Sequence, residues 1–150
     1  MKKFNFSLQK ILEIKEQLLD NLKIELSNIS AELNLLQLNI ENLKTKYADM
    51  ENEYVEKTYN SITANEITYY KMLIENILKQ IENKESLKEI LLKKKAAKQK
   101  EIINMNMEIS SLEKLKEKEL EKHSKECLKK EEIFIEEFIS NKSMTNKFAV

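Results

Sequence analysis

Apolar residues recur through the first part of the chain in alternating steps of four and three. A repeat averaging 3.5 residues keeps one narrow stripe on the same side of a supercoiled α-helix. The repeat therefore predicts a long helix whose stripe, or seam, packs against another helix. Its positions are Leu8, Leu12, Leu19, Leu22, Leu26, Ile29, Leu33, Leu36, Ile40, Leu43, Tyr47, Met50 and Tyr54, and Lys15 takes the slot between Leu12 and Leu19.

The second part of the chain starts with the same rhythm and then weakens. In one phase the apolar positions are Tyr70, Ile74, Ile77, Ile81, Leu91, Ile102, Met105, Ile109 and Leu112, and lysine occupies the intervening positions 84, 88, 95 and 98. The apolar residues Leu87, Leu92, Ala96 and Ala97 lie off this phase and indicate a local change of phase, as a stutter produces.

The lysine-rich stretch KKKAAKQK at 93–100 has two interpretations. It is either a solvated face whose long side-chain stems cover the seam, or an electrostatic patch for an acidic partner.

The segment NSITANE at 60–66 is where the helical pattern stops, in a chain of 150 residues without glycine or proline. Thr63 and Glu66 have the spacing of a capping box, and Ile62 and Ile67 that of a hydrophobic staple. Asn60 is a common substitute for glycine where a helix ends in a left-handed residue. We therefore expect one helix to end here and a second to begin.

The start of the chain shows similar signals, with Ser7 as the helix cap and Phe6 and Ile11 as the staple. We expect helix 1 at about 7–59, a bend at 60–63, helix 2 at 64–140 and a frayed tail at 141–150. The expected fold is all-α, a long antiparallel two-helix coiled-coil hairpin forming a single domain over 1–150, with residue 8 facing roughly residue 116. The alternative is one continuous helix in a parallel dimer, with 60–66 as a kink.

The segment beyond about residue 120 has no partner in such a hairpin. Phe134, Ile135, Phe138 and Ile139 are therefore expected to form an exposed apolar patch. Unpartnered apolar surface usually marks an interface.

The composition excludes several classes of function. Without glycine, the chain has no phosphate-cradling loop or dinucleotide fingerprint. Its 26 basic residues are all lysine and are balanced by 26 acidic ones, which argues against nucleic-acid binding. We expect no catalytic residue, no cofactor and no metal. His123 and Cys127 stand four residues apart and share a helix face. The alternative to the absence of a metal is a site in which these two ligands are completed by another chain. The alternative to a non-enzymatic protein is an enzyme assisted by this pair.

The sequence also bears on location. No run approaches the roughly 20 apolar residues needed to span a bilayer. The opening MKKFNFSLQK lacks the apolar core and cleavage site of a secretory signal. We therefore expect a cytosolic chain without direct membrane insertion.

Three stretches resemble the flagellar export protein FliJ family. The opening FNFSLQKILEIKEQLLDNLKIEL has the family's Phe-x-Phe-x-Leu phrase, carried by Phe4, Phe6, Leu8, Ile11 and Leu12. The stretches ENEYVEKTYNSITANEITYYKMLIENILKQIE and SSLEKLKEKELEKHSKECLKKEE also agree with the family pattern. The arginine that members often carry early in the first helix is either replaced here by Lys15 or lost.

The resemblance implies a non-enzymatic stalk and general chaperone of flagellar type III protein export. Such a protein is cytoplasmic and peripheral at the inner face of the cell membrane, at the flagellar base. The implied partners are the export ATPase ring, the cytoplasmic domain of the export-gate membrane protein, and export chaperones. The resemblance assigns ATPase binding to Phe4, Phe6, Lys10, Glu13, Glu16, Lys114, Glu117, Lys118 and Glu121. It assigns gate binding to Tyr47, Met50, Tyr54, Tyr70, Leu73 and Ile77.

Other interpretations of the periodicity remain. A generic coiled-coil scaffold or a prefoldin-like holdase has the same repeat, and the stalk proteins of the related injectisome share the hairpin. The residues assigned to gate binding can equally be interpreted as residues of the hairpin core.

Overall fold

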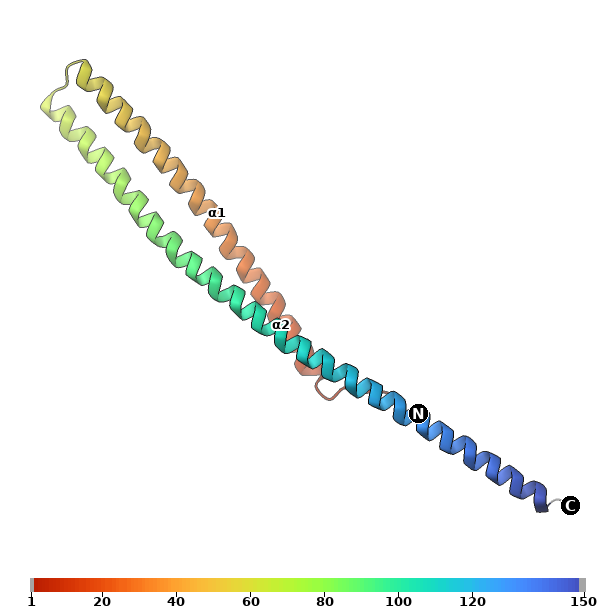
Figure 1. The fold of residues 1–150 in the computed structure, drawn as a ribbon. Coiled ribbons are helices and arrows are strands. Elements are labelled where there is room, and N and C mark those ends of the chain that lie inside the picture. Colours follow the sequence, from red (N-terminus) through yellow and green to blue (C-terminus); the bar gives the residue numbers. More distant parts are fainter. Residues whose placement is uncertain (1, 149–150) are drawn as a thin grey trace. The chain divides into compact units, whose positions relative to one another are not determined.

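The hairpin consists of two α-helices, and the computed structural model describes residues 2–148. Helix α1 spans Gln9–Tyr59 and helix α2 spans Ala64–Phe148 (Figure 1). No strand occurs within residues 2–148. The predicted all-α antiparallel hairpin is confirmed, and the alternative of one continuous helix is wrong.

Residue contacts divide the chain into two units. The bend unit is Asp20–Ile103, and the terminal unit combines Met1–Leu19 with Asn104–Val150. In each unit a part of α1 lies beside a part of α2 and runs in the opposite direction (Figure 1). The single domain over 1–150 stays a prediction.

The helix bounds differ from the predicted ones at the two ends of the chain. α1 ends at Tyr59 and α2 begins at Ala64, which are the bounds expected for the bend. α1 begins at Gln9, later than the expected residue 7. The predicted frayed tail at 141–150 is helical as far as Phe148, and its last two residues lie outside the described range.

The left-handed residue at the bend is Ser61, with φ 67°, and not Asn60 as predicted. The backbone N–H of Asn60 still donates to the Lys57 carbonyl at 3.2 Å, so the helical turn continues through Asn60. The reversal therefore falls on the next residue. Ser61 carries a Cβ into a backbone region that favours glycine, so the conformation costs free energy.

Thr63 caps α2 as predicted. Its Oγ1 accepts a hydrogen bond from the Glu66 N–H at 3.2 Å, and its carbonyl accepts one from the Ile67 N–H at 3.0 Å. Ile62 and Ile67 are both half-buried, as expected for the predicted staple. The capping side chain thus fixes where α2 begins without help from glycine or proline.

The predicted cap at the start of α1 is wrong. The Gln9 N–H donates to the Phe6 carbonyl at 3.1 Å, and within residues 2–148 the Ser7 hydroxyl makes no hydrogen bond. Ile11 is 45% exposed and Phe6 is buried, and the predicted staple between them stays a prediction. In the segment before α1, Phe4 packs against His123 of α2.

The core of the bend unit follows the four-three seam of α1. Leu33, Leu36 and Ile40 of α1 form a buried cluster with Leu91 of α2, and Ile29 packs against it. Ile40 is completely buried. The seam positions of α1 in this unit are all buried or half-buried, which confirms the predicted repeat.

The seam of α2 keeps its phase through the lysines, so the predicted change of phase is wrong. Lys84, Lys88, Lys95 and Lys98 are half-buried. The off-phase residues Leu87, Leu92, Ala96 and Ala97 are all exposed. A lysine has a four-carbon stem that covers apolar surface while its ammonium reaches water, so it can occupy the position of a leucine.

Paired residues across the bend unit show what these lysines cover. Lys98 Nζ lies 2.6 Å from Glu25 Oε2, and the Tyr70 hydroxyl donates to Glu53 Oε1 at 3.2 Å. Both pairs fit the same antiparallel register, in which a residue further along α1 faces a residue earlier in α2. This register places Lys88 level with Leu36. The best-buried stretch of α1, residues 33–40, thus lies level with residues 83–90 of α2, whose seam positions include Lys84 and Lys88.

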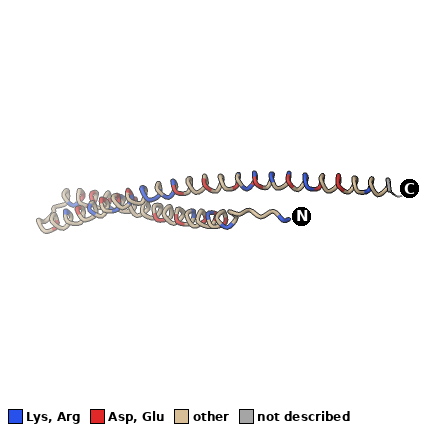
Figure 2. The backbone as a smooth tube through the Cα atoms, turned by 90° about the horizontal axis from the view of Figure 1, so that it is seen from below, with Lys and Arg blue, Asp and Glu red and all other residues tan. Residues whose placement is uncertain are grey.

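Charged residues of both signs are interspersed along both helices (Figure 2). Some of them pair across the hairpin, as Lys44 does with Glu85 at 3.5 Å in the bend unit. Exposed ion pairs contribute only about 0 to 1 kcal/mol each. The apolar seam and the lysine stems therefore stabilise the hairpin more than its surface charges do.

The bend predicts opposite effects of glycine at two adjacent positions. Ser61→Gly relieves the left-handed conformation and is expected to raise the free energy of unfolding by about 0.5 to 1 kcal/mol. Asn60→Gly is expected to lower it by a similar amount, because Asn60 continues the helix. Urea unfolding followed by far-UV circular dichroism measures both. Ser61→Ala is the control, and a gain there equal to that of glycine would contradict the explanation.

The lysine seam predicts that a leucine stabilises the hairpin at one lysine but not at another. Lys88→Leu replaces a half-buried stem opposite Leu36 with a fully apolar one and is expected to raise the free energy of unfolding by about 1 kcal/mol. Lys94→Leu, at an exposed position of the same helix, serves as the matched control and is expected to change it little. Equal effects of the two variants in the same urea titration would show that Lys88 does not belong to the seam.

Candidate functional site

The residues assigned to ATPase binding all lie in the terminal unit, where they divide into two kinds. Lys10, Glu13, Glu16, Lys114, Glu117, Lys118 and Glu121 are exposed on α1 and α2. Phe4 is half-buried and Phe6 is only 4% exposed. The charged members are therefore accessible to a partner, whereas the two phenylalanines are largely covered within the terminal unit.

The N-terminal segment is attached to α2 by an aromatic contact. The rings of Phe4 and His123 are tilted at 59° with centroids 5.5 Å apart. At the start of α1, Lys116 Nζ donates to Gln9 Oε1 at 2.8 Å, close to the predicted facing of residues 8 and 116. The non-helical residues before α1 thus continue the contact with α2 beyond the end of the helix pair.

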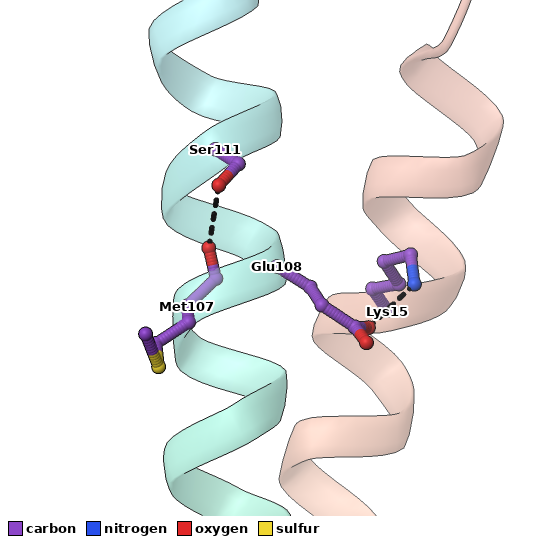
Figure 3. Close-up of polar contacts among 4 residues, drawn as sticks. All are labelled: Lys15, Met107, Glu108 and Ser111. Atoms are coloured by element: carbon purple, nitrogen blue, oxygen red, sulfur yellow. Dashed lines mark hydrogen bonds and ion pairs between the residues drawn. The ribbon is translucent and has the colours of Figure 1, made fainter.

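Lys15 fills its seam slot and forms an ion pair across the terminal unit. Its Nζ lies 2.6 Å from Glu108 Oε2, and its side chain is only 28% exposed (Figure 3). Near the pair, the Ser111 hydroxyl donates to the Met107 carbonyl at 3.0 Å within α2. Sequence reasoning identified Lys15 as a gap in the repeat but missed Glu108. The expected antiparallel register would have found it, since the two residues are level.

An open groove of about 1070 Å³ lies between the N-terminal segment and α2. Phe4, His123, Cys127, Phe134 and Ile135 contribute apolar and aromatic surface to it. Lysines and glutamates line it as well, from Lys2 to Glu131. The groove can accept an apolar side chain of a partner while charged groups remain near its rim.

His123 and Cys127 contact each other in this groove. The Cys127 Sγ lies 3.8 Å from Nδ1 and 3.9 Å from Nε2 of His123. Among residues 2–148, no three His, Cys, Asp or Glu side chains are grouped so that they could hold a metal ion. The pair therefore supplies at most two ligands, and a metal site that another chain completes stays a hypothesis.

The residues assigned to gate binding all lie in the bend unit, along its seam. Tyr70 and Ile77 are 6% and 5% exposed, and Tyr47, Met50, Tyr54 and Leu73 are half-buried. The rings of Tyr54 and Tyr70 pack with centroids 5.7 Å apart. Burial, and next the hydrogen bond to Glu53, raise the pKa of Tyr70 above its usual value. These six residues therefore contribute to hairpin packing, and their contact with a partner stays a prediction.

Exposed apolar residues close to the bend were missed by the sequence reasoning. Tyr59 is 85% exposed, Tyr69 60% and Met72 66%. All three lie off the four-three seam, and that mismatch is the signal that could have identified them. They offer a partner accessible aromatic and thioether surface, and the Tyr69 ring lies next to that of the buried Tyr70, with centroids 5.7 Å apart.

Neither helix, as far as residues 2–148 extend, contains a stretch with the length and hydropathy that crossing a bilayer requires.

Comparison with known proteins identifies the family. The family model described as Flagellar FliJ protein matches residues 4–147, nearly the whole chain. Neither the curated proteins nor the solved structures contain a match. The match confirms the resemblance seen in the three stretches of sequence, and no enzymatic family is indicated. The chain belongs to the FliJ family and is a component of flagellar protein export.

Proposed function

We propose that this chain acts as the central stalk and general chaperone of the export apparatus, with no catalysis of its own. The terminal unit binds the ring of the export ATPase, and the bend unit binds the cytoplasmic domain of the export-gate membrane protein. The protein works in the cytoplasm, peripheral to the inner face of the membrane at the flagellar base. It also receives empty export chaperones through its exposed helical faces.

The observation that carries the proposal is the exposed charge on the terminal unit. Lys114 and Lys118 lie four residues apart on α2, so they share one face of the helix. Glu117 and Glu121 repeat the same spacing with the opposite sign. A surface of alternating charge favours complementary charged surfaces and sets the orientation of docking, which suits a shaft held inside a ring of subunits.

The mechanism that fits this surface is differential binding. A stalk that contacts one conformation of the ATPase more strongly than the others shifts the ring toward that conformation. The shift favours either assembly of the ring or its turnover, and the stalk itself needs no reactive group. The packed seam keeps the charged side chains at fixed spacings along the helix.

Charge reversal on α2 tests ATPase binding. The purified protein is expected to stimulate hydrolysis by the cognate export ATPase, and Lys114→Glu with Lys118→Glu is expected to weaken this stimulation about five- to tenfold. Lys71→Glu with Lys79→Glu changes the charge equally on exposed positions of the bend unit and is the matched control. Absence of stimulation and of co-elution by the unaltered protein would refute the proposed role.

Alanine substitutions near the bend test gate binding. Tyr69→Ala with Met72→Ala removes exposed side chains and is expected to weaken binding of the gate's cytoplasmic domain about tenfold, with helicity unchanged. Tyr54→Ala with Ile77→Ala tests the residues assigned by resemblance, and binding is measured by calorimetry beside circular dichroism. If only the second pair weakens binding and helicity falls with it, those residues are core. If neither pair weakens binding, the bend unit is not the gate-binding end.

A further inference from the structure

A second stripe runs along α1 in the bend unit, on the side of the helix that faces away from the buried seam. Its positions follow the same alternating steps of three and four, and all of them are exposed. None carries a charge, in a chain in which 35% of the residues are charged. This outward stripe consists of Asn21, Ile24, Asn28, Ala31, Leu35, Leu38, Asn42 and Thr45.

Three large side chains give the outward stripe its apolar surface. Ile24 is 59% exposed, Leu35 62% and Leu38 53%. Exposed apolar residues that are aligned on one helix face, and not scattered singly, are typical of an interaction site. Because the steps average 3.5 residues, the surface that fits the stripe is another helix lying along α1 for about 36 Å.

The outward face of α2 in the same unit has a different character. Its positions include Lys79, Lys93 and Lys100, and all three are exposed. Charged residues of this kind are usual on the solvent face of an amphipathic helix. The uncharged stripe is therefore a property of α1 and not a general consequence of facing water.

The positions that border the outward stripe carry only negative charge from Asp20 to Glu41. The borders consist of Asp20, Ser27, Asn34 and Glu41 on one side and of Glu25, Glu32 and Asn39 on the other. Glu25 pairs with Lys98 across the hairpin. Within residues 2–148, the carboxylates of Asp20, Glu32 and Glu41 form no ion pair and are exposed. They are free to attract a basic surface.

We propose that the outward stripe binds an amphipathic helix of a different protein, whose uncharged four-three seam is bordered by lysine or arginine. The apolar seams bury each other, and the basic borders meet the three free carboxylates. A second copy of the same stripe is disfavoured in either direction, because acidic borders would then face acidic borders. The proposal does not depend on the stalk role, since it involves neither the ATPase nor the export gate.

The asparagines of the outward stripe determine how strong and how specific the contact is. Asn21, Asn28 and Asn42 would be enclosed by the bound helix, so each needs a hydrogen-bond partner there. An asparagine at a seam position fixes the register of two helices at a cost in stability. We therefore expect the partner to carry uncharged polar residues level with them, and the binding to be reversible.

Two synthetic peptides that differ only in the charge of their borders test the proposal. Each has about four heptads with leucine and asparagine in the four-three seam, and its borders are lysine in one peptide and glutamate in the other. The full chain is expected to bind the lysine-bordered peptide at least about tenfold more tightly, as measured by fluorescence anisotropy in about 0.1 M salt. Equal binding of the two peptides, or no binding of the lysine-bordered one, would overturn the proposal.

Serine substitutions test the place of binding. Leu35→Ser with Leu38→Ser is expected to raise the Kd of the lysine-bordered peptide at least about tenfold, with helicity unchanged by circular dichroism. Leu87→Ser with Ile90→Ser removes two side chains that are 47% and 54% exposed and three residues apart on α2, and this matched control is expected to leave the Kd unchanged. Equal effects of the two pairs would refute the assignment to α1. Self-association of the unaltered chain that the serine pair on α1 abolishes would identify a second copy as the occupant and would also refute it.

Charge reversal tests the role of the borders. Glu32→Lys with Glu41→Lys is expected to reverse the preference, so that the glutamate-bordered peptide binds more tightly. Glu75→Lys with Glu82→Lys changes the charge equally at exposed positions of α2 and is expected to keep the original preference. A preference that survives reversal on α1, or that is lost in the α2 control, would contradict recognition by the acidic borders.

Discussion

The packing of one four-three seam against another is the interaction on which the rest of this structure depends. It buries Leu33, Leu36 and Ile40 against a helix whose seam at that level holds Lys84 and Lys88 as well as Leu91. Lysine stems complete the contact, so a long helix pair forms although the facing seam is only partly apolar. The outward faces remain available for charged and aromatic residues that a partner can reach.

Much of the fold follows from the sequence because its physical causes are local. A sustained 3.5-residue period and the Thr63 cap determine both helices and the position of the bend. The errors arose where a residue had two possible environments. Asn60 and Ser61 both lie where the chain could reverse. The hydrogen bond from the Asn60 N–H to the Lys57 carbonyl keeps Asn60 in the helical turn, so the reversal falls on Ser61. Leu87 and Leu92 look like seam residues until the long stem of lysine is counted as apolar surface.

The candidate surfaces were harder to predict, because exposure depends on the partner helix. Phe6 and Tyr70 are aromatic residues in segments that resemble the family pattern, yet both are buried. Tyr69 and Met72 do not differ in residue type from the apolar residues of the seam. Only their position outside the seam indicates that they are accessible. Partner-binding residues therefore become recognisable after the register is known.

The half-buried lysines of α2 also have a consequence for how the chain avoids misassembly. If two α2 helices aligned in parallel along this stretch, Lys84, Lys88, Lys95 and Lys98 would each meet their own duplicate in a narrow contact, and the ammonium groups would repel. Folding back against α1 removes that repulsion, since Leu36 and its neighbours lie opposite. The lysines in the seam of α2 thus disfavour pairing with another α2 and favour pairing with α1 of the same polypeptide.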